Sequence, residues 1–187
     1  MIAKASQQTA YATGSDFCQI FKSDMKSLYL LSLLLTGDSE KAEQCFVTGL
    51  DDCAADNQVF REWARSWARR AVIKNAIRLI APQPTTTGAE SRRVVQKVSD
   101  QMKAELRAEI FTVASLEPFE RFAFVMSVLE GYSDRDCTLL LGCTRETLIA
   151  ARNSALQQIA HHEEPNAGVR PEQGLHLAMP AHLAMPA

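Results

Sequence analysis

Apolar side chains recur at intervals of three and four residues near the start of the chain, which is the spacing of one face of an α-helix. Between residues 15 and 35 this stripe comprises Phe17, Ile20, Phe21, Leu28, Leu31 and Leu35. The pattern predicts one helix over 15–35, with Ser15 as the residue that caps its first turn. Gly37 is suited to end that helix, and Asp38 is suited to cap the next one.

Two further amphipathic stretches follow in the same part of the chain. The one after Asp38 has an apolar side made of Ala42, Cys45, Phe46, Gly49 and Leu50. A third helix is expected from about Phe60 to Ile80, with a buried side made of Phe60, Trp63, Trp67, Ile73, Ile77 and Ile80. Together these stretches predict an all-α unit over residues 1–81.

The composition changes after this unit. Residues 81–90 read APQPTTTGAE, with two prolines, three threonines and one glycine. Because such a segment neither buries apolar surface nor continues a helix, we expect a linker over 82–92. Helical periodicity resumes near Ser91, and we place a second all-α unit at 93–162.

Turn and capping residues divide the second unit into short helices. Pro118 suits the first position of one helix. Ser133, with Asp136 three residues later, is typical of the start of another. Gly142 is suited to end that helix, and Thr144 to cap a last one. A short helix, a tight turn and a longer helix in this order predict a helix-turn-helix.

Residues 163–187 are poor in large apolar side chains, and we expect a disordered tail there. The sequence HLAMPA occurs at 176–181 and again at 182–187. Two copies of six residues cannot build a solenoid core. A duplication in an unconstrained segment is the simplest interpretation of the doublet, and a docking peptide is the alternative.

Composition narrows the classes of function. The chain has five cysteines without a C-x-x-C pair, and its four histidines all lie past residue 160. We therefore expect no metal site, no cofactor and no catalytic set that uses histidine, and the protein is not expected to be an enzyme. The sequence shows neither a signal-peptide pattern nor the apolar run of ~20 residues that a membrane span needs. We expect a soluble, cytoplasmic protein without membrane insertion.

Charge is distributed unevenly, although the formal net charge is only −2. The third expected helix carries one acid, Glu62, and six cations: Arg61, Arg65, Arg69, Arg70, Lys74 and Arg78. Spacings of four place the first three cations on one side and the last three on another. This concentration of charge predicts an anionic partner such as nucleic acid. Trp63 and Trp67 are interpreted as core residues by their spacing, with stacking on unpaired bases as the alternative.

The order of motifs resembles a known family of proteins. The stretches LSLLLTGDSEKAEQ, FREWARSWARRAVIKNAI and SLEPFERFAFVMSVLEGYSDRDCTLLLGCTRETLIAARNSALQQI together resemble a bacterial RNA polymerase sigma factor of the extracytoplasmic-function group. The resemblance covers about residues 15–80 and 90–160. It implies two helical domains without catalytic chemistry. The first, of region 2 type, would bind the polymerase core and promoter DNA; the second, of region 4 type, would bring a helix-turn-helix to an upstream promoter element.

This sequence departs from the family pattern in the first domain. The helix that binds the polymerase core usually carries an acidic D-x-V-Q-E-x-F pattern, whereas this chain has EQCFVTGLDD. The resemblance assigns contact with the core to Glu43, Asp51 and Asp52, which keep the acidity of that helix. The stretch from Leu50 to Phe60 is also several residues shorter than the family pattern implies, which removes much of the aromatic-rich loop with which family members capture a flipped-out promoter base.

The last expected helix has few of the cations that a DNA-binding helix uses. We expect its inner face to contain Leu148, Ala151 or Arg152, Ala155 and Ile159, and its outer face Arg145, Thr147, Ile149, Asn153, Leu156 and Gln157. Arg145 is suited to a guanine or a phosphate, and Thr147 and Asn153 to hydrogen bonds with either. Residues 118–160 nevertheless contain four arginines and five acids.

An apolar stripe on this helix adds a second interpretation. Ile149, Arg152 and Leu156 share one face, which the first domain, an anti-sigma factor or a second copy of the chain would cover. The alternative is that the helix is more deeply buried than its pattern implies. The sequence thus leaves three hypotheses: a sigma-like protein that binds polymerase core and promoter DNA, a sigma-like protein that binds only an anti-sigma factor or another protein, and a helical DNA-binding regulator that works without polymerase.

Overall fold

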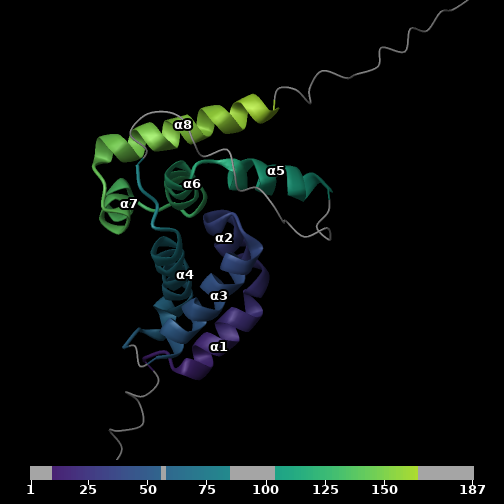
Figure 1. Ribbon diagram of the computed structural model, residues 1–187. Coiled ribbons are helices and arrows are strands. Elements are labelled where there is room, and N and C mark those ends of the chain that lie inside the picture. The colour runs from purple at the N-terminus through teal and green to yellow at the C-terminus, as the bar shows by residue number, and fades with distance from the viewer. Residues whose placement is uncertain (1–9, 56–57, 85–103, 164–187) are drawn as a thin grey trace, which may run out of the picture.

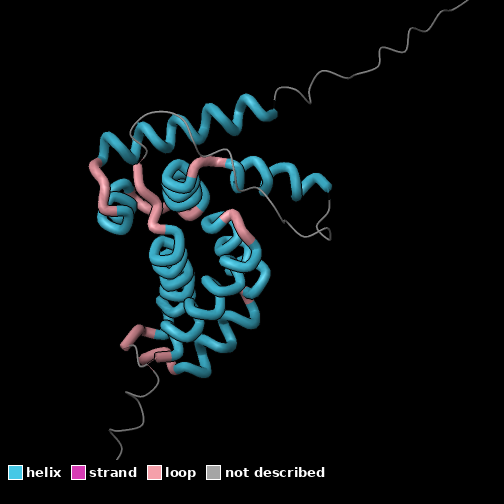
Figure 2. Tube along the Cα trace, viewed as in Figure 1, coloured by secondary structure: helices cyan, strands magenta, loops and turns pink. Residues whose placement is uncertain are grey.

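The computed structural model describes residues 10–55, 58–84 and 104–163, and within these ranges the protein is all-α (Figures 1 and 2). The described helices are α1 (Gly14–Ser23), α2 (Met25–Thr36), α3 (Ser39–Ala54), α4 (Ala64–Ile80), α5 (Ala104–Ser115), α6 (Pro118–Phe124), α7 (Asp134–Leu141) and α8 (Arg145–Glu163). A 3₁₀ turn, η1 (Arg61–Trp63), precedes α4, and a π-helical turn, η2 (Val125–Leu129), follows α6. None of the described helices is both long and apolar enough to cross a membrane.

The helix expected over residues 15–35 is two helices, because the chain breaks at Asp24 between α1 and α2. The predicted N-cap, Ser15, was wrong as well. Thr13 caps α1: its hydroxyl accepts from the backbone N–H of Asp16 at 3.3 Å, and the Asp16 carboxylate accepts from the backbone N–H of Thr13 at 2.8 Å. Thr13 has the extended backbone that a cap requires, whereas Ser15 already lies inside the first turn.

The next boundary was predicted correctly. Gly37 ends α2 in the left-handed conformation, with φ of 68°, and the side chain of Asp38 accepts from the backbone N–H of Lys41 at 2.9 Å. The predicted apolar stripe on these helices is largely buried, and its buried members are Phe17, Phe21, Leu28, Leu31 and Leu35.

The buried side of α4 differs from the expected one. Of the expected core residues Ile73 is buried, whereas Ile77 and Ile80 are half-buried. The rest of the buried side consists mostly of alanines: Ala64, Ala68, Ala71 and Ala76, with Val72. Phe60, Trp63 and Trp67, which the spacing assigned to the core, are exposed. The reason is the close approach of α3, since a methyl group built on Gly49 would lie 3.3 Å from the side chain of Val72. That spacing leaves room for alanine between the helices and none for an indole ring.

The four capping predictions in the second half are confirmed. Pro118 occupies the first turn of α6. The hydroxyl of Ser133 accepts from the backbone N–H of Asp136 at 3.1 Å. Gly142 ends α7 with φ of 65°, and Thr144 caps α8 by accepting from the N–H of residue 147 at 3.3 Å. Helices α7 and α8 therefore follow one another across a tight turn, in the order that the sequence predicts.

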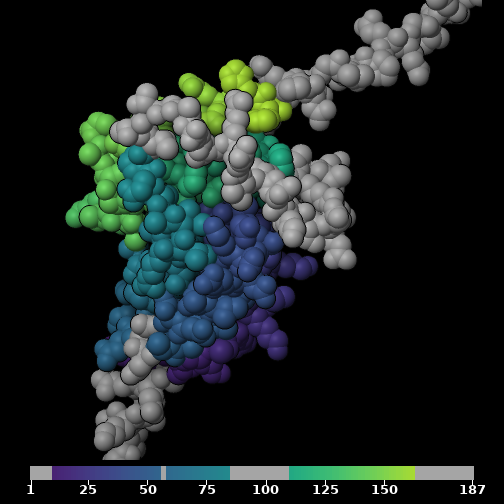
Figure 3. All heavy atoms as spheres, viewed as in Figure 1, coloured from purple at the N-terminus to yellow at the C-terminus, as the bar shows by residue number. Residues whose placement is uncertain are grey.

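Helices α1–α4 and helices α5–α8 adjoin (Figures 1 and 3). One continuous buried cluster contains residues of both groups. Arg121 lies at this junction and is buried. Its guanidinium donates to the carbonyls of Leu35 and Thr36 at the end of α2, both at 3.1 Å. It also donates to the carbonyls of Ala114 and Leu116 at the end of α5, at 2.9 and 3.2 Å. The carbonyls of Leu35, Thr36 and Ala114 lie in the last turn of a helix, where no further N–H of the helix reaches them, so Arg121 satisfies two helix ends at once.

The predicted domain boundaries stay predictions. Of the expected linker over 82–92, residues 85–92 lie outside the described ranges. The helical signal from Ser91 to 103 and the expected tail, apart from Glu163, lie outside them as well, as does the HLAMPA doublet.

Candidate nucleic-acid interface

One side of α4, together with the η1 turn before it, carries two exposed tryptophans and two half-buried cations. Trp63, Trp67, Arg70 and Lys74 follow one another at spacings of four, three and four, so they share one face of the helix. The exposed fractions of Trp63 and Trp67 are 58% and 36%. The ammonium group of Lys74 lies 5.7 Å from the ring centre of Trp67, within the range of a cation–π interaction. We call these four residues the Trp–cation face.

Two further aromatic rings extend this surface toward the start of the chain. Tyr11 and Phe60 stack with their ring centres 4.8 Å apart, and Phe60 meets Trp63 edge to face at 5.3 Å. Two backbone hydrogen bonds hold the segment before α1 beside the start of η1. The N–H of Ala12 donates to the carbonyl of residue 59 at 2.7 Å, and the N–H of residue 61 donates to the carbonyl of residue 10 at 2.9 Å. Sequence reasoning missed Tyr11 because only the pairing of these distant segments brings it beside Phe60.

The remaining cations of this region bind carboxylates of the same chain. The pairs are Arg61–Asp16 at 3.2 Å, Arg65–Asp24 at 3.1 Å, Arg78–Asp52 at 2.9 Å and Arg69–Glu130. Four of the six cations are thus offset by carboxylates that lie elsewhere in the sequence. Within the described ranges no ion pair involves Arg70 or Lys74. The unoffset positive charge of the helix therefore lies beside the exposed tryptophans.

The four ion pairs differ in strength. The side chains of Arg61, Arg65 and Arg78 are more than half exposed, and such surface pairs contribute about 0–1 kcal/mol each. An anionic ligand can exchange with them at small cost. Arg69 differs because it donates from Nε to Glu130 at 2.7 Å, and the Glu130 side chain is only 9% exposed. The hydrogen bond to Glu130 also raises the pKa of Arg69, so this guanidinium is committed to the junction between the two groups of helices.

The residues expected to contact the polymerase core lie on α3. Glu43 and Asp51 are exposed, and with the exposed Val47 they follow one another at spacings of four on one side of the helix. Asp52 lies apart from them, because its carboxylate binds Arg78 and accepts from the amide of Asn75 at 3.0 Å. The structure thus groups Glu43 with Asp51 and assigns Asp52 to the contact between α3 and α4.

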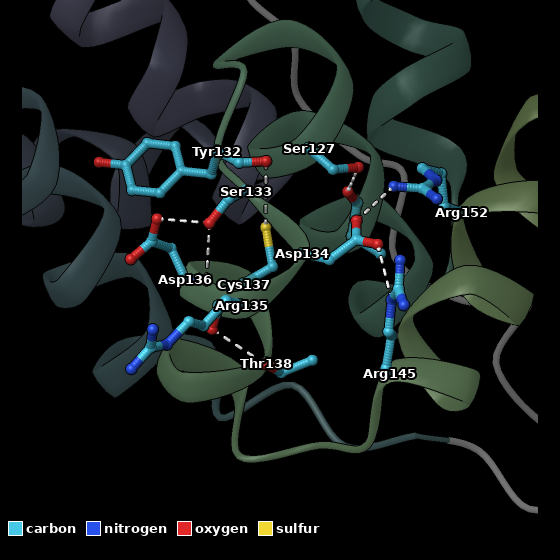
Figure 4. A network of polar contacts seen from close by, with 11 residues as sticks. Ser127, Tyr132, Ser133, Asp134, Arg135, Asp136, Cys137, Thr138, Arg145 and Arg152 are labelled. Atoms are coloured by element: carbon cyan, nitrogen blue, oxygen red, sulfur yellow. Dashed lines mark hydrogen bonds and ion pairs between the residues drawn. The ribbon is translucent and has the colours of Figure 1, made fainter.

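Across the turn at Gly142, Asp134 at the start of α7 binds both arginines of α8. Its Oδ2 accepts from Nε of Arg145 at 3.2 Å, and its Oδ1 accepts from Nη1 of Arg152 at 2.9 Å (Figure 4). The hydrogen bonds from Arg152 and then Arg145 lower the pKa of Asp134. Of the other predicted DNA contacts, Asn153 is exposed, whereas the half-buried Thr147 has its hydroxyl 3.0 Å from that of Thr144.

The inner face of α8 consists of Leu148, Ala151 and Ala155, which are buried, and the half-buried Ile159. Of the two residues that the sequence left open for the inner face, Ala151 and Arg152, it is therefore Ala151 that lies there. Of the predicted partner face, Ile149 and Arg152 are half-buried and only Leu156 is exposed. This favours the interpretation that the helix is more buried than its pattern implies. An exposed leucine that the sequence analysis did not single out, Leu139, lies on α7.

The described residues contain no group of three or more His, Cys, Asp or Glu side chains placed to hold a metal ion. No protein-family model matches this chain, and comparisons with curated proteins and with solved structures likewise find no match. The arrangement on α4 consequently has to be interpreted from its own chemistry. Exposed aromatic rings beside cations that form no ion pair with a described residue are suited to ligands that combine flat π surfaces with negative charge.

Proposed function

We propose that this protein is a sigma-like transcription initiation protein that binds RNA polymerase core and promoter DNA, with the Trp–cation face of α4 as its contact to unpaired promoter bases. The observation that carries the proposal is the coincidence of exposed Trp63 and Trp67 with the two cations of the helix that have no ion pair among the described residues. A buried pair of tryptophans would have supported a structural role instead.

The chemistry of single-stranded nucleic acid fits this face. Stacking of one base on an aromatic side chain contributes about 1–3 kcal/mol and tolerates any base, because each base has a π surface. Arg70 and Lys74 supply the positive charge that follows a phosphate backbone. The stacked rings of Tyr11 and Phe60 beside Trp63 lengthen the aromatic surface to accept more than one base.

The other elements take the remaining roles in this proposal. The exposed side of α3 with Glu43 and Asp51 contacts the polymerase core, and α7 with α8 approaches duplex DNA. The surface pairs of Arg61 and Arg65 with aspartates can open to admit phosphates, since each contributes little to stability. Arg69 is left out of the contact, because its guanidinium donates to the largely buried carboxylate of Glu130 and to the hydroxyl of Ser27.

The experiment uses the full chain with purified polymerase core and a fluorescent single-stranded oligonucleotide. We expect co-elution with the core at low salt and an increase in anisotropy with the oligonucleotide. Trp67→Ala should weaken binding to the oligonucleotide by about 5- to 100-fold, the equivalent of one lost stacking contact. The matched control is Tyr29→Ala, because Tyr29 on α2 has the same exposed fraction of 36% and lies in a different aromatic group, against Phe46. Equal affinities of the two variants, or no binding to the core, would contradict the proposal.

A second candidate function is supported by the ion pairs. Four cations of the α4 region and both arginines of α8 bind carboxylates of their own chain, which weakens the long-range attraction of a DNA backbone. A sigma-like protein that engages only an anti-sigma factor or another protein would keep such a surface. The absence of binding to the core and to single-stranded and duplex DNA, with binding to an anti-sigma factor retained, would favour this second function.

A further inference from the structure

Asp134 divides its two carboxylate oxygens between two guanidinium groups. Arg145 donates from Nε to one oxygen, and Arg152 donates from Nη1 to the other (Figure 4). The carboxylate comes from the first residue of α7, and the two arginines come from α8 on the other side of the turn. A single acid thus fixes two side chains of the second helix of the helix-turn-helix.

The contact of Arg145 leaves one edge of its guanidinium free. Only Nε is bound by Asp134, and neither Nη1 nor Nη2 of Arg145 donates a hydrogen bond to a residue that the structure describes. The side chain is 71% exposed. The two free nitrogens form a planar fork of parallel N–H donors, a geometry that suits two neighbouring acceptor atoms.

We infer that Asp134 is a positioning residue that orients Arg145 to read a guanine in the major groove of duplex DNA. The inference rests on the proposed function, in which α7 and α8 approach the duplex. Guanine presents O6 and N7 side by side in the major groove, and a bidentate arginine is the commonest specific contact to this pair. Arg145 is the first residue of α8, and recognition helices make their base contacts with their N-terminal residues.

The charges around Arg145 favour a base edge over an anionic ligand. Asp134 lies against its Nε, and Glu146 is its neighbour in sequence in the first turn of α8. A phosphate or a carboxylate of a protein partner would approach these acids and be repelled. The edge of a guanine carries no net charge and offers only its two acceptors. Because Asp134 already fixes the guanidinium of Arg145 in the free protein, less side-chain entropy of Arg145 is lost when DNA binds.

The test selects duplexes from a randomised library with the full-length protein and then replaces each guanine of an enriched duplex in turn. For the wild type we expect one guanine whose replacement weakens binding by about 5- to 100-fold. Arg145→Lys, which keeps the charge but lacks the fork, should bind all the replaced duplexes nearly equally. Asp134→Asn removes a negative charge, so it should bind every duplex more tightly while its discrimination at that guanine falls.

The matched control is Arg135→Ala, which removes an exposed cation from α7 next to Asp134 without touching the fork. It should weaken binding to all duplexes alike and keep the discrimination. The inference is wrong if Asp134→Asn sharpens the discrimination, since Asp134 would then mask Arg145. It is equally wrong if Arg145→Lys keeps the discrimination, or if no duplex is enriched. Failure of the proposed function is measured in a separate experiment, the binding of Trp67→Ala to a single-stranded oligonucleotide. The two outcomes are distinguishable because the contact to single-stranded DNA uses α4, whereas Arg145 lies on α8.

Discussion

The guanidinium group of Arg69 on α4 donates two hydrogen bonds to the carboxylate of Glu130, which lies 61 residues further along the chain. The same guanidinium donates from Nη1 to the hydroxyl of Ser27 on α2 at 2.9 Å. Glu130 directly follows η2, so this pair joins the N-terminal helices to the C-terminal helices. With the buried guanidinium of Arg121, it gives the junction two fixed polar contacts in addition to the shared apolar cluster.

The first prediction concerns this pair. Glu130→Gln removes the charge and replaces one acceptor oxygen by an amide that cannot accept, so an N–H of Arg69 loses its partner. We expect the free energy of unfolding to fall by roughly 1–3 kcal/mol, the usual penalty for an unsatisfied and poorly hydrated polar group. Urea denaturation measures the loss. For a chain of this size each kcal/mol also lowers Tm by about 2–4 °C.

Asp24→Asn is the matched control for that variant. It also neutralises a carboxylate that binds an arginine near the start of α4, but Arg65 in this pair is 69% exposed. We expect a loss of at most about 1 kcal/mol, because water replaces the partner of an exposed side chain. If both variants lose the same stability, the contact between Arg69 and Glu130 does not hold the two groups of helices together.

The second prediction concerns the space beside Arg121. Gly37 has φ of 68°, and a methyl group at this position would lie 2.7 Å from Nη1 of Arg121 and 3.3 Å from the carbonyl oxygen of Ala114. Because four carbonyls hold the buried guanidinium, it cannot move aside without losing hydrogen bonds. Gly37→Ala should therefore destabilise the protein by the backbone strain of about 1–2 kcal/mol and by a further 1–3 kcal/mol, approximately, for the displaced hydrogen bonds.

Gly131→Ala separates these two contributions. Gly131 has the same φ of 68°, but nothing lies within 4 Å of a methyl group built there. This variant should lose only the backbone contribution of about 1–2 kcal/mol. Thermal denaturation of both variants gives the difference, and equal losses would mean that Arg121 does not fill the space beside Gly37.

The third prediction concerns pH and the buried thiols. Burial raises the pKa of Cys45 to about 11 and that of Cys53 to about 12. The Cys45 thiol also donates to the carbonyl of Val72 at 3.2 Å. In the unfolded chain these thiols ionise near pH 9, at about the usual value for cysteine. Between that pH and the raised values the folded state binds more protons than the unfolded state, so stability should fall as the pH rises from about 9 to 11.

Alkaline denaturation between pH 8 and pH 11 measures this loss. Cys53→Ala should reduce its slope, because one of the thiols that ionise only on unfolding is gone. Alkylation of the native protein at pH 8 gives an independent readout, since Cys18 is exposed whereas Cys45 and Cys53 are buried. We expect rapid modification of Cys18 and slow modification of the buried pair, as measured by mass spectrometry of peptides. Rapid alkylation of Cys45 would contradict the burial of α3 against α4.

The sequence predicted the parts of this fold that depend on local chemistry. Gly37, Asp38, Pro118, Gly142 and Thr144 each take the predicted place at a helix end. A cap depends on a few neighbouring residues, so its signal is contained within the sequence. Ser15 was the exception, because the reciprocal bonds of Thr13 and Asp16 outcompete it.

What the sequence did not predict depends on how closely the helices approach. Trp63 and Trp67 follow a spacing that fits the core, yet the narrow contact at Gly49 and Val72 leaves no space there for an indole ring. The positive charge of the α4 region was likewise overestimated, because the carboxylates that bind its arginines could not be identified from the sequence. Asp16, Asp24 and Glu130 are far from it in sequence, so no local pattern shows that they offset its charge. Tertiary packing decided both points.

The last prediction follows from this redistribution of charge. In binding to a single-stranded oligonucleotide, each cation that contacts a phosphate contributes about 0.7 to the slope of log affinity against log salt. Arg70 and Lys74 have no ion pair among the described residues, so Lys74→Ala should lower the slope by about that amount. Lys26→Ala removes an equal charge from the exposed surface of α2 and should leave the slope nearly unchanged. Arg69→Ala should also leave the slope unchanged, because Glu130 already binds this guanidinium.

Titrations of each variant with the oligonucleotide between low and moderate salt measure all three slopes. A larger effect of Arg69→Ala than of Lys74→Ala would mean that the pair with Glu130 opens in the complex, and that the DNA contact follows the other side of α4.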